Sequence, residues 1–167
     1  MPVTAPNNPT GHELLISRTF HAPRALVWKA WTDPLHIKQW WGPKEFDNTA
    51  CEADLRVGGT FLLIMCAPDG NAYPCKGIYR EIVEPARIVY DSEAEENHPC
   101  GAGLPPRARV TITFTEHADK TTLLLHTLFE TADRRDAANE GGFSKSWGEA
   151  LERLAATLQQ SATGELT

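Results

Sequence analysis

The chain has 167 residues, of which 41% are hydrophobic and 23% are charged, and these values are typical of a single globular domain. A net charge of −6 and an isoelectric point near 5.5 argue against nucleic acid or an anionic membrane surface as a partner. No apolar run approaches the roughly 18 residues of a membrane span. Residues 1–11 lack the basic start and the apolar run of a signal peptide. We therefore expect a disordered tail followed by a cytoplasmic domain.

The amino-terminal part predicts one strand and two short helices. The strand is Glu13 to His21, which is rich in β-forming residues. A helix from Pro23 to Thr32 begins with a proline, which suits a first helical position because it has no N–H to satisfy. Asp33 can then cap a second helix from Pro34 to Trp41. Two short helices joined by a tight break form a V-shaped pair that can close one end of a curved sheet.

From residue 46 onward the pattern changes to strands and turns. The six predicted strands are Phe46–Ala53, Gly59–Ala67, Tyr73–Val83, Arg87–Ser92, Arg107–Thr115 and Thr121–Glu130. Between the second and third of them, Pro68-Asp69-Gly70 predicts a hairpin turn, since proline presets φ and glycine takes the strained position.

The last strand does not reveal its inward face. Leu123 to Leu125 is apolar on both faces, so alternation alone cannot assign a side. If Leu124, His126 and Leu128 point inward, the odd-numbered side chains would form an exposed apolar row that indicates a dimer contact. The sequence therefore leaves the oligomeric state undecided between a monomer and a homodimer.

The carboxy-terminal part predicts one long amphipathic helix from Phe143 to Leu158. Its apolar residues recur at steps of four, four, three and four: Phe143, Trp147, Leu151, Leu154 and Leu158. Such a stripe must be buried against the sheet. The predicted fold is therefore α+β: an antiparallel sheet of about seven strands around one long helix, a helix-grip arrangement. We expect a single domain over residues 12–160, with tails at 1–11 and 161–167.

Several stretches together resemble a known family. They are residues 18–34, 40–43, 52–61, 68–70, 77–90 and 146–154, which include RTFHAPRALVWKAWTDP, WWGP and SWGEALERL. The set resembles the family related to the carboxy-terminal domain of the activator of heat-shock protein 90 ATPase, which belongs to the START-like (SRPBCC, polyketide-cyclase-like) superfamily. The resemblance implies a helix-grip fold with a deep apolar cavity between sheet and last helix. Members of the superfamily bind lipids, polyketides, plant hormones and flavonoid-like molecules, and some are cyclases or hydrolases.

The residues expected to line such a cavity are aromatic or aliphatic, with few polar groups. They are Trp40, Trp41, Phe61, Leu63, Met65, Tyr79, Tyr90, Val110, Ile112, Phe114, Leu124, His126, Phe143, Trp147 and Leu151. His126 is the candidate acid/base residue by position, and the hydroxyl of Tyr79 or Tyr90 could serve instead or orient a ligand. Ordinary core packing explains the same stripe and the same tryptophans without any ligand.

The four cysteines show no CxxC pair and no dense framework. Reduced thiols are the expectation, with a disulfide between Cys66 and Cys75 across the hairpin as the alternative. His98 and Cys100 resemble half a metal site, but no second His/Cys pair completes it, so we expect no metal and no cofactor.

Three functions remain. The leading one is a module that binds a small hydrophobic molecule (aromatic, polyketide-like or lipid-like), because apolar walls are plentiful and paired catalytic groups are scarce. The second is an enzyme that uses the same cavity, with His126 or a tyrosine as acid/base. The third, from the family resemblance alone, is a stress-response protein that contacts a heat-shock protein 90 homologue.

Overall fold

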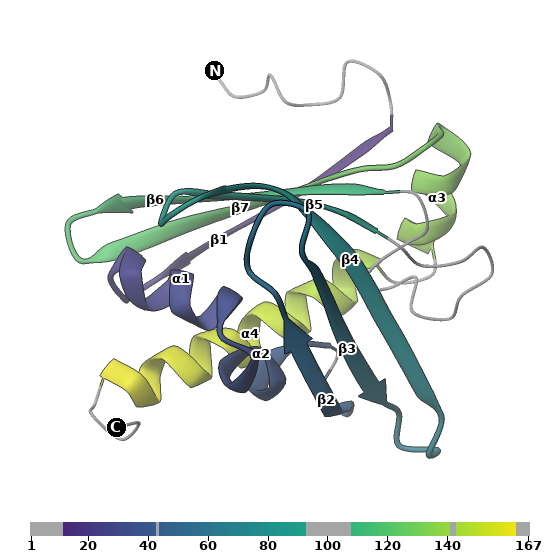
Figure 1. Ribbon diagram of the computed structural model, residues 1–167, viewed down its shortest axis with the longest axis horizontal. Helices are drawn as coiled ribbons and strands as arrows, with labels where there is room; N and C mark the ends of the chain where they lie inside the picture. The colour runs from purple at the N-terminus through teal and green to yellow at the C-terminus, as the bar shows by residue number, and fades with distance from the viewer. Residues whose placement is uncertain (1–11, 43, 93–107, 141–142, 163–167) are drawn as a thin grey trace.

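The computed structural model describes residues 12–42, 44–92, 108–140 and 143–162 (Figure 1). The elements in chain order are β1 (Glu13–Phe20), α1 (Arg24–Thr32), α2 (Pro34–Trp40), β2 (Asp47–Ala53), β3 (Thr60–Cys66), β4 (Ala72–Val83), β5 (Arg87–Ser92), β6 (Arg109–His117), β7 (Lys120–Leu128), α3 (Ala132–Glu140) and α4 (Phe143–Ala162). The seven strands form one antiparallel sheet in the order β1-β7-β6-β5-β4-β3-β2. The predicted α+β helix-grip fold is confirmed.

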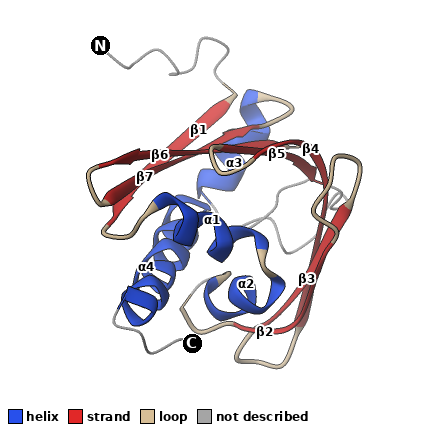
Figure 2. Cartoon of the chain, turned by 60° about the vertical axis from the view of Figure 1, so that its left-hand side comes forward, coloured by secondary structure: helices blue, strands red, loops and turns tan. Residues whose placement is uncertain are grey.

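The sheet is strongly curved, and α1, α2 and α4 lie on its concave side (Figure 2). The four described residues of the predicted stripe on α4 are all buried: Trp147, Leu151, Leu154 and Leu158 are 3%, 0%, 0% and 4% exposed. The side chain of Phe143 lies outside the described residues. The two short helices and the capping role of Asp33 are also confirmed: Asp33 separates α1 from α2, and its Oδ1 accepts a hydrogen bond from the N–H of Leu35 at 3.0 Å.

The inward face of β7 is the odd-numbered one. Leu123 and Leu125 are 0% and 1% exposed and belong to the core. Leu124, His126 and Leu128 point to the opposite, uncovered face and are half-buried. This corrects the arrangement that placed those three inside, and the exposed apolar row that it implied does not form. The cause is register: Leu124 pairs with Ser17 of β1 and Thr113 of β6, which lie on the same outer face.

A short helix was missed. No element was predicted between the last strand and α4, yet Ala132–Glu140 is helical and none of its residues is buried. It contacts α4 and β1. The hydroxyl of Thr131 accepts a hydrogen bond from the N–H of Arg134 at 3.1 Å, and Arg134 forms an ion pair with Glu130 at 2.9 Å. Capping and an i,i+4 pair therefore support a helix that has no apolar stripe.

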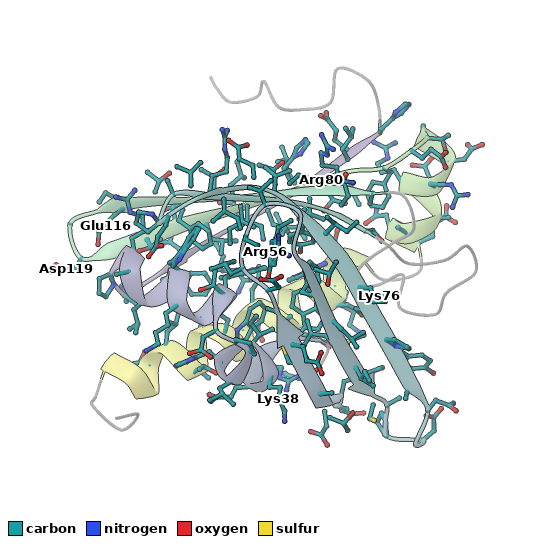
Figure 3. The ribbon with its side chains drawn as sticks, in the orientation of Figure 1. Lys38, Arg56, Lys76, Arg80, Glu116 and Asp119 are labelled. Atoms are coloured by element: carbon teal, nitrogen blue, oxygen red, sulfur yellow. The ribbon has the colours of Figure 1, made fainter. Side chains whose placement is uncertain are left out.

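Charged side chains lie on the surface. Those labelled in Figure 3 are all exposed: Lys38, Arg56, Lys76, Arg80, Glu116 and Asp119. The hairpin turn at Pro68-Asp69-Gly70 is confirmed, with Gly70 at φ +91°. No helix among the described residues is long and apolar enough to cross a membrane.

The cysteines differ from the expectation. Cys51 and Cys66 are free, so the alternative disulfide between Cys66 and Cys75 is wrong. Cys75 is nevertheless disulfide-bonded, which corrects the expectation of a reduced thiol there. His98, Cys100 and the predicted tail at 1–11 lie outside the described residues. Of the predicted tail at 161–167, the first two residues belong to α4 and the others lie outside the described residues.

Candidate functional site: an aromatic cavity

Four tryptophans from distant parts of the chain meet inside the fold, and Trp31 of α1 lies at their centre. Its ring centroid is 4.7 Å from that of Trp40, 6.2 Å from that of Trp41 and 5.9 Å from that of Trp147, on which it stacks with an interplanar angle of 11°. Trp41 also meets Trp147 edge to face at 5.1 Å. The two short helices and α4 are thus joined through aromatic contacts, each of which contributes about 0.5–1.5 kcal/mol beyond its buried area.

Next to this cluster the interior holds a small space, which we call the aromatic cavity. Its walls come from α1, α2, the turn after α2, and strands β2 to β5, and consist of Trp31, Ile37, Trp41, Cys51, Phe61, Leu63, Tyr79, Ile88 and Tyr90. Its volume is about 20 Å³. Pockets that bind drug-sized ligands measure roughly 300–1,000 Å³, whereas a space of about 20 Å³ holds about one water molecule. The deep cavity implied by the family resemblance is therefore largely filled by side chains.

The structure places the residues expected to line a cavity in several parts of the fold. Five of the fifteen expected residues line the aromatic cavity, namely Trp41, Phe61, Leu63, Tyr79 and Tyr90. Seven others are buried in the core around it: Trp40, Met65, Val110, Ile112, Phe114, Trp147 and Leu151. Leu124 and His126 lie on the outer face of the sheet, away from the cavity.

Four lining residues were missed: Trp31, Ile37, Cys51 and Ile88. Ile88 could have been found, because it precedes Tyr90 by two residues on the same strand and therefore shares its face. Trp31 packs in the core and also lines the cavity. Cys51 lies opposite Leu63 in the sheet, and this pairing could not be inferred before the register was known.

Three lining residues each carry a buried polar atom that has no hydrogen-bond partner among the residues that the structure describes. They are the indole Nε1 of Trp31, the indole Nε1 of Trp41 and the hydroxyl of Tyr90. All three residues are at most 4% exposed. By contrast, Trp40 does not line the cavity, and its indole N–H donates to the carbonyl of Ala30 at 2.9 Å. A buried polar group without a partner costs about 1–3 kcal/mol, so three on one wall need a physical explanation.

The titratable groups of the wall are held in their neutral forms. Burial raises the pKa of the Cys51 thiol to about 11, and nearby Asp33 and Glu52 add to the shift while Lys38 opposes it. Burial also raises the pKa values of Tyr79 and Tyr90, and each is raised further by a neighbouring group of the same wall: Cys51 for Tyr79, and Tyr79 for Tyr90. Near pH 7 the two phenols therefore act as hydrogen-bonding groups.

A glycine shapes the wall of β3 and β4. Gly77 lies opposite Phe61 in the sheet, and a Cβ at this position would overlap the Phe61 ring. The ring thus lies over the bare backbone of Gly77, with its centroid 5.3 Å from that of Tyr79 and 4.9 Å from that of Tyr90. Glycine is required here for the close approach and not for an unusual φ.

Two side chains hold the carboxyl end of α2, where helical carbonyls lack partners within the helix. The amide of Asn48 on β2 donates to the carbonyls of Lys38 and Trp41, both at 2.9 Å. From the other side, the guanidinium of Arg153 donates to the carbonyl of Trp41 at 3.2 Å and to that of Gly42 at 3.1 Å. We call Asn48 and Arg153 the α2 clamp. It fixes Trp41, and with it one wall of the cavity.

The former candidate acid/base residue has a different place. The Nε2 of His126 lies 2.9 Å from a carboxylate oxygen of Glu13 on β1, on the outer face of the sheet. Neither residue lines the aromatic cavity. His126 therefore joins two neighbouring strands and cannot reach a ligand held between sheet and helices. Glu130, four residues further along the chain, pairs with Arg134.

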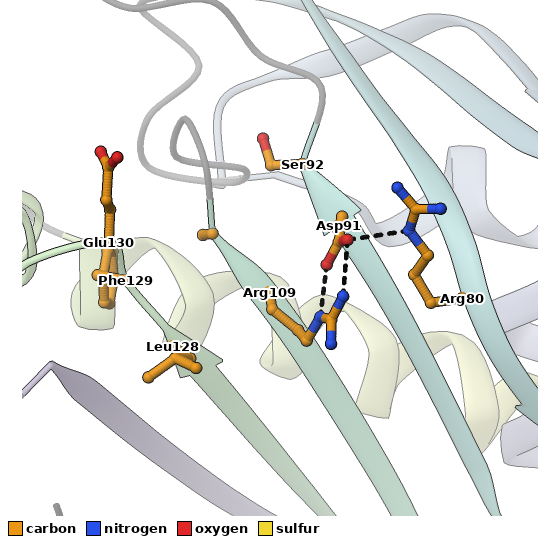
Figure 4. A pocket seen from close by; sticks show the side chains of 8 residues that line it. Arg80, Asp91, Ser92, Arg109, Leu128, Phe129 and Glu130 are labelled. Carbon is orange, nitrogen blue, oxygen red and sulfur yellow. Dashed lines mark hydrogen bonds and ion pairs between the residues drawn. The ribbon is translucent and has the colours of Figure 1, made fainter. Parts of the chain in front are cut away.

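A second, open hollow of about 420 Å³ lies where β5 and β7 end and β6 begins. Figure 4 shows Asp91 on its wall between two guanidinium groups. Asp91 accepts from Arg109 at 2.7 and 2.9 Å and from Arg80 at 2.9 Å, which lowers the pKa of its carboxyl. The segment that joins Ser92 to Ala108 is outside the described residues, so the hollow has no defined wall on that side. In the part of the chain that is described, no group of three His, Cys, Asp or Glu side chains could hold a metal ion.

The sequence matches the family described as "Activator of Hsp90 ATPase homolog 1-like protein" over residues 21–159. The chain belongs to this family. Among solved structures, a protein from Nitrosomonas europaea is 27% identical, with a TM-score of 0.83 over 93% of this chain and 99% of that one. A protein from Mycobacterium smegmatis is 25% identical, with a TM-score of 0.78 over 90% and 93% of the two chains. No curated protein matches the sequence. These likenesses confirm the START-like family resemblance and do not identify a ligand.

Proposed function

We propose that this domain binds a small hydrophobic molecule at the aromatic cavity. The observation that carries the proposal is the make-up of the wall: it is largely apolar, and three of its residues carry a buried polar atom that has no partner in the described part of the chain. Apolar walls supply most of the affinity in such sites, and a few fixed polar groups orient the ligand. An interior that served packing alone would gain stability by pairing these atoms or replacing them with apolar groups.

A ligand must enlarge the space of about 20 Å³ in order to enter. The element best placed to move is α2, which has seven residues and contributes Ile37, with Trp41 following directly after it. Its carboxyl end is held by the side chains of the α2 clamp, whereas β2 to β5 are held by backbone ladders. Binding then couples to an outward shift of α2, and the ligand replaces part of the tryptophan packing.

The enzyme alternative loses its main candidate, because His126 lies on the outer face of the sheet. Tyr79 and Tyr90 do line the cavity, but burial raises their pKa values and makes them poor proton donors and poor bases near pH 7. These phenols suit the orientation of a bound acceptor better than proton transfer. Ligand binding therefore explains the wall more fully than acid/base catalysis does.

The test uses the tryptophan cluster as its reporter. Naphthalene, flavone and palmitate are titrated into the protein while tryptophan fluorescence is followed, and saturable quenching by at least one of them is expected. Cys51→Leu adds volume at the cavity wall and should weaken that binding at least tenfold. The matched control is Cys66→Leu, since Cys66 is also a free cysteine but faces the outer side of β3. Absence of saturable quenching by all three compounds, or equal affinities of the two variants, would overturn the proposal.

A further inference from the structure

We propose, resting on the function above, that the ligand is an uncharged carbonyl compound whose oxygen accepts hydrogen bonds from Trp31, Trp41 and Tyr90. The three residues come from α1, from the turn after α2 and from β5. They line one space of about 20 Å³, which is large enough for a single oxygen-sized group.

The chemistry of the unpaired atoms selects an acceptor. An indole N–H only donates, so Trp31 and Trp41 cannot be satisfied by a ligand hydrogen-bond donor. The hydroxyl of Tyr90 can donate as well. A carbonyl oxygen has two lone pairs, so two of the three donors pair with it directly and the third shares a lone pair with one of them. The oxygen brings no hydrogen that would need a partner of its own. An alcohol would bring such a hydrogen into a wall where two of the three polar groups cannot accept it.

The lack of cationic side chains in the cavity wall favours an uncharged hydrogen-bond acceptor. None of the nine lining residues is a lysine, an arginine or a histidine, so no cation faces the space. A carboxylate buried there would lose its hydration without gaining a counter-charge. The raised pKa values of Cys51, Tyr79 and Tyr90 report the same property, since each reflects an environment that resists negative charge. Fatty-acid carboxylates are thus disfavoured at the unpaired atoms, and aryl or alkyl ketones are favoured.

The experiment compares acetophenone, ethylbenzene and benzoate, which share one ring and differ in the group it carries. Protein labelled with ¹⁵N in the tryptophan indoles is titrated with each compound, and the Nε1–H signals are assigned with Trp31→Phe and Trp41→Phe. Acetophenone should move both signals downfield and saturably. Ethylbenzene should bind without the downfield shift, and benzoate at pH 7 should bind at least a hundredfold more weakly than acetophenone.

Tyr90→Phe removes one of the three groups and keeps the ring. It should weaken acetophenone about tenfold, the equivalent of one hydrogen bond, while the affinity for ethylbenzene stays the same or rises. The control is Tyr73→Phe, because Tyr73 is a partly buried tyrosine of β4 that does not line the cavity. If acetophenone binds but moves neither indole signal, or if Tyr90→Phe affects acetophenone and ethylbenzene equally, the acceptor site is refuted while cavity binding stands. If neither compound binds and the panel above also fails, both proposals fall together.

Discussion

The guanidinium of Arg153, in the middle of α4, donates a hydrogen bond to the carbonyl of Trp41 at 3.2 Å and so ties the last helix to the end of α2. Arg153→Met should remove the hydrogen bond to the carbonyl of Gly42 and one of the two to the carbonyl of Trp41, which keeps Asn48. We expect the free energy of unfolding to fall by about 2 kcal/mol. The substitution should also speed amide hydrogen exchange in α2 more than in β6. Urea denaturation and exchange mass spectrometry measure these two effects.

Lys145→Met is the control for this substitution, since Lys145 is an exposed cation of the same helix. It should change stability by less than about 0.5 kcal/mol. If exchange in α2 were equally slow in Arg153→Met and in the wild type, the α2 clamp would not hold that helix. Faster ligand association in Arg153→Met would in addition support α2 as the moving wall.

Gly77→Ala should disturb the aromatic cavity from outside it. The added Cβ overlaps the ring of Phe61, which must then tilt toward Tyr79 and Tyr90. We expect a loss of about 1–3 kcal/mol in stability, as for other overpacked positions, together with a loss of ligand affinity. Thermal denaturation and fluorescence titration measure the two.

The contrasting substitution is Gly148→Ala. Gly148 lies within α4, and a Cβ there would come no closer than 3.8 Å to any other group, the nearest being Arg18. Alanine should stabilise the helix by up to about 1 kcal/mol, because glycine is a poor helix former. A stabilised Gly77→Ala, or a destabilised Gly148→Ala, would contradict the packing described for these two positions.

The architecture was predictable because two periodicities alternate cleanly along the chain. Val110, Ile112 and Phe114 recur every second residue and are all buried, and the stripe of α4 recurs at helical spacing. The sequence did not predict the inward face of β7 or the helix α3, because the spacing of apolar residues is ambiguous in the first and absent in the second. Leu123 to Leu125 fits either face of a strand, and the choice depends on the partners of β7 in the sheet. The helix α3 has no apolar stripe at all, since it packs at the edge of the core.

The candidate site was less predictable than the fold, because its defining property is a missing contact. Nothing in the order of residues indicates that the indole of Trp40 finds the carbonyl of Ala30 while those of Trp31 and Trp41 find no partner. The volume of the internal cavity cannot be predicted from the sequence either. The aromatic residues that indicate a pocket wall are the same ones that fill the space, and Trp31 stacked on Trp147 occupies room that a ligand would need.

His126→Ala tests the assignment of this residue to the outer face. Because its Nε2 pairs with Glu13 on the side of the sheet away from the helices, the substitution should leave the affinity for acetophenone within about twofold of the wild type. Stability should fall by roughly 1 kcal/mol, since a carboxylate loses its hydrogen-bond partner. Isothermal titration and urea denaturation provide the measurements. A large loss of affinity would return His126 to the list of ligand contacts.

Stability at alkaline pH should depend on Cys51. Burial raises the pKa of its thiol from 9.0 to about 11, so the folded chain holds this proton more tightly than the unfolded chain does. The unfolded state loses the proton first as pH rises, and the stabilisation present below pH 9 is therefore lost progressively toward pH 11. The phenols of Tyr79 and Tyr90 act in the same direction, starting near pH 10, because their pKa values are also raised.

Urea denaturation at intervals between pH 7 and about pH 11 should show this decline in the free energy of unfolding, and Cys51→Ala should make the decline shallower. Cys66→Ala removes the other free thiol, on the outer face of β3, and controls for the loss of a cysteine as such. Equal declines in the wild type and Cys51→Ala would mean that the cavity wall admits charge as readily as water does. In that case the preference for an uncharged ligand would lose its electrostatic support, because the same environment is held to disfavour a thiolate and a bound carboxylate.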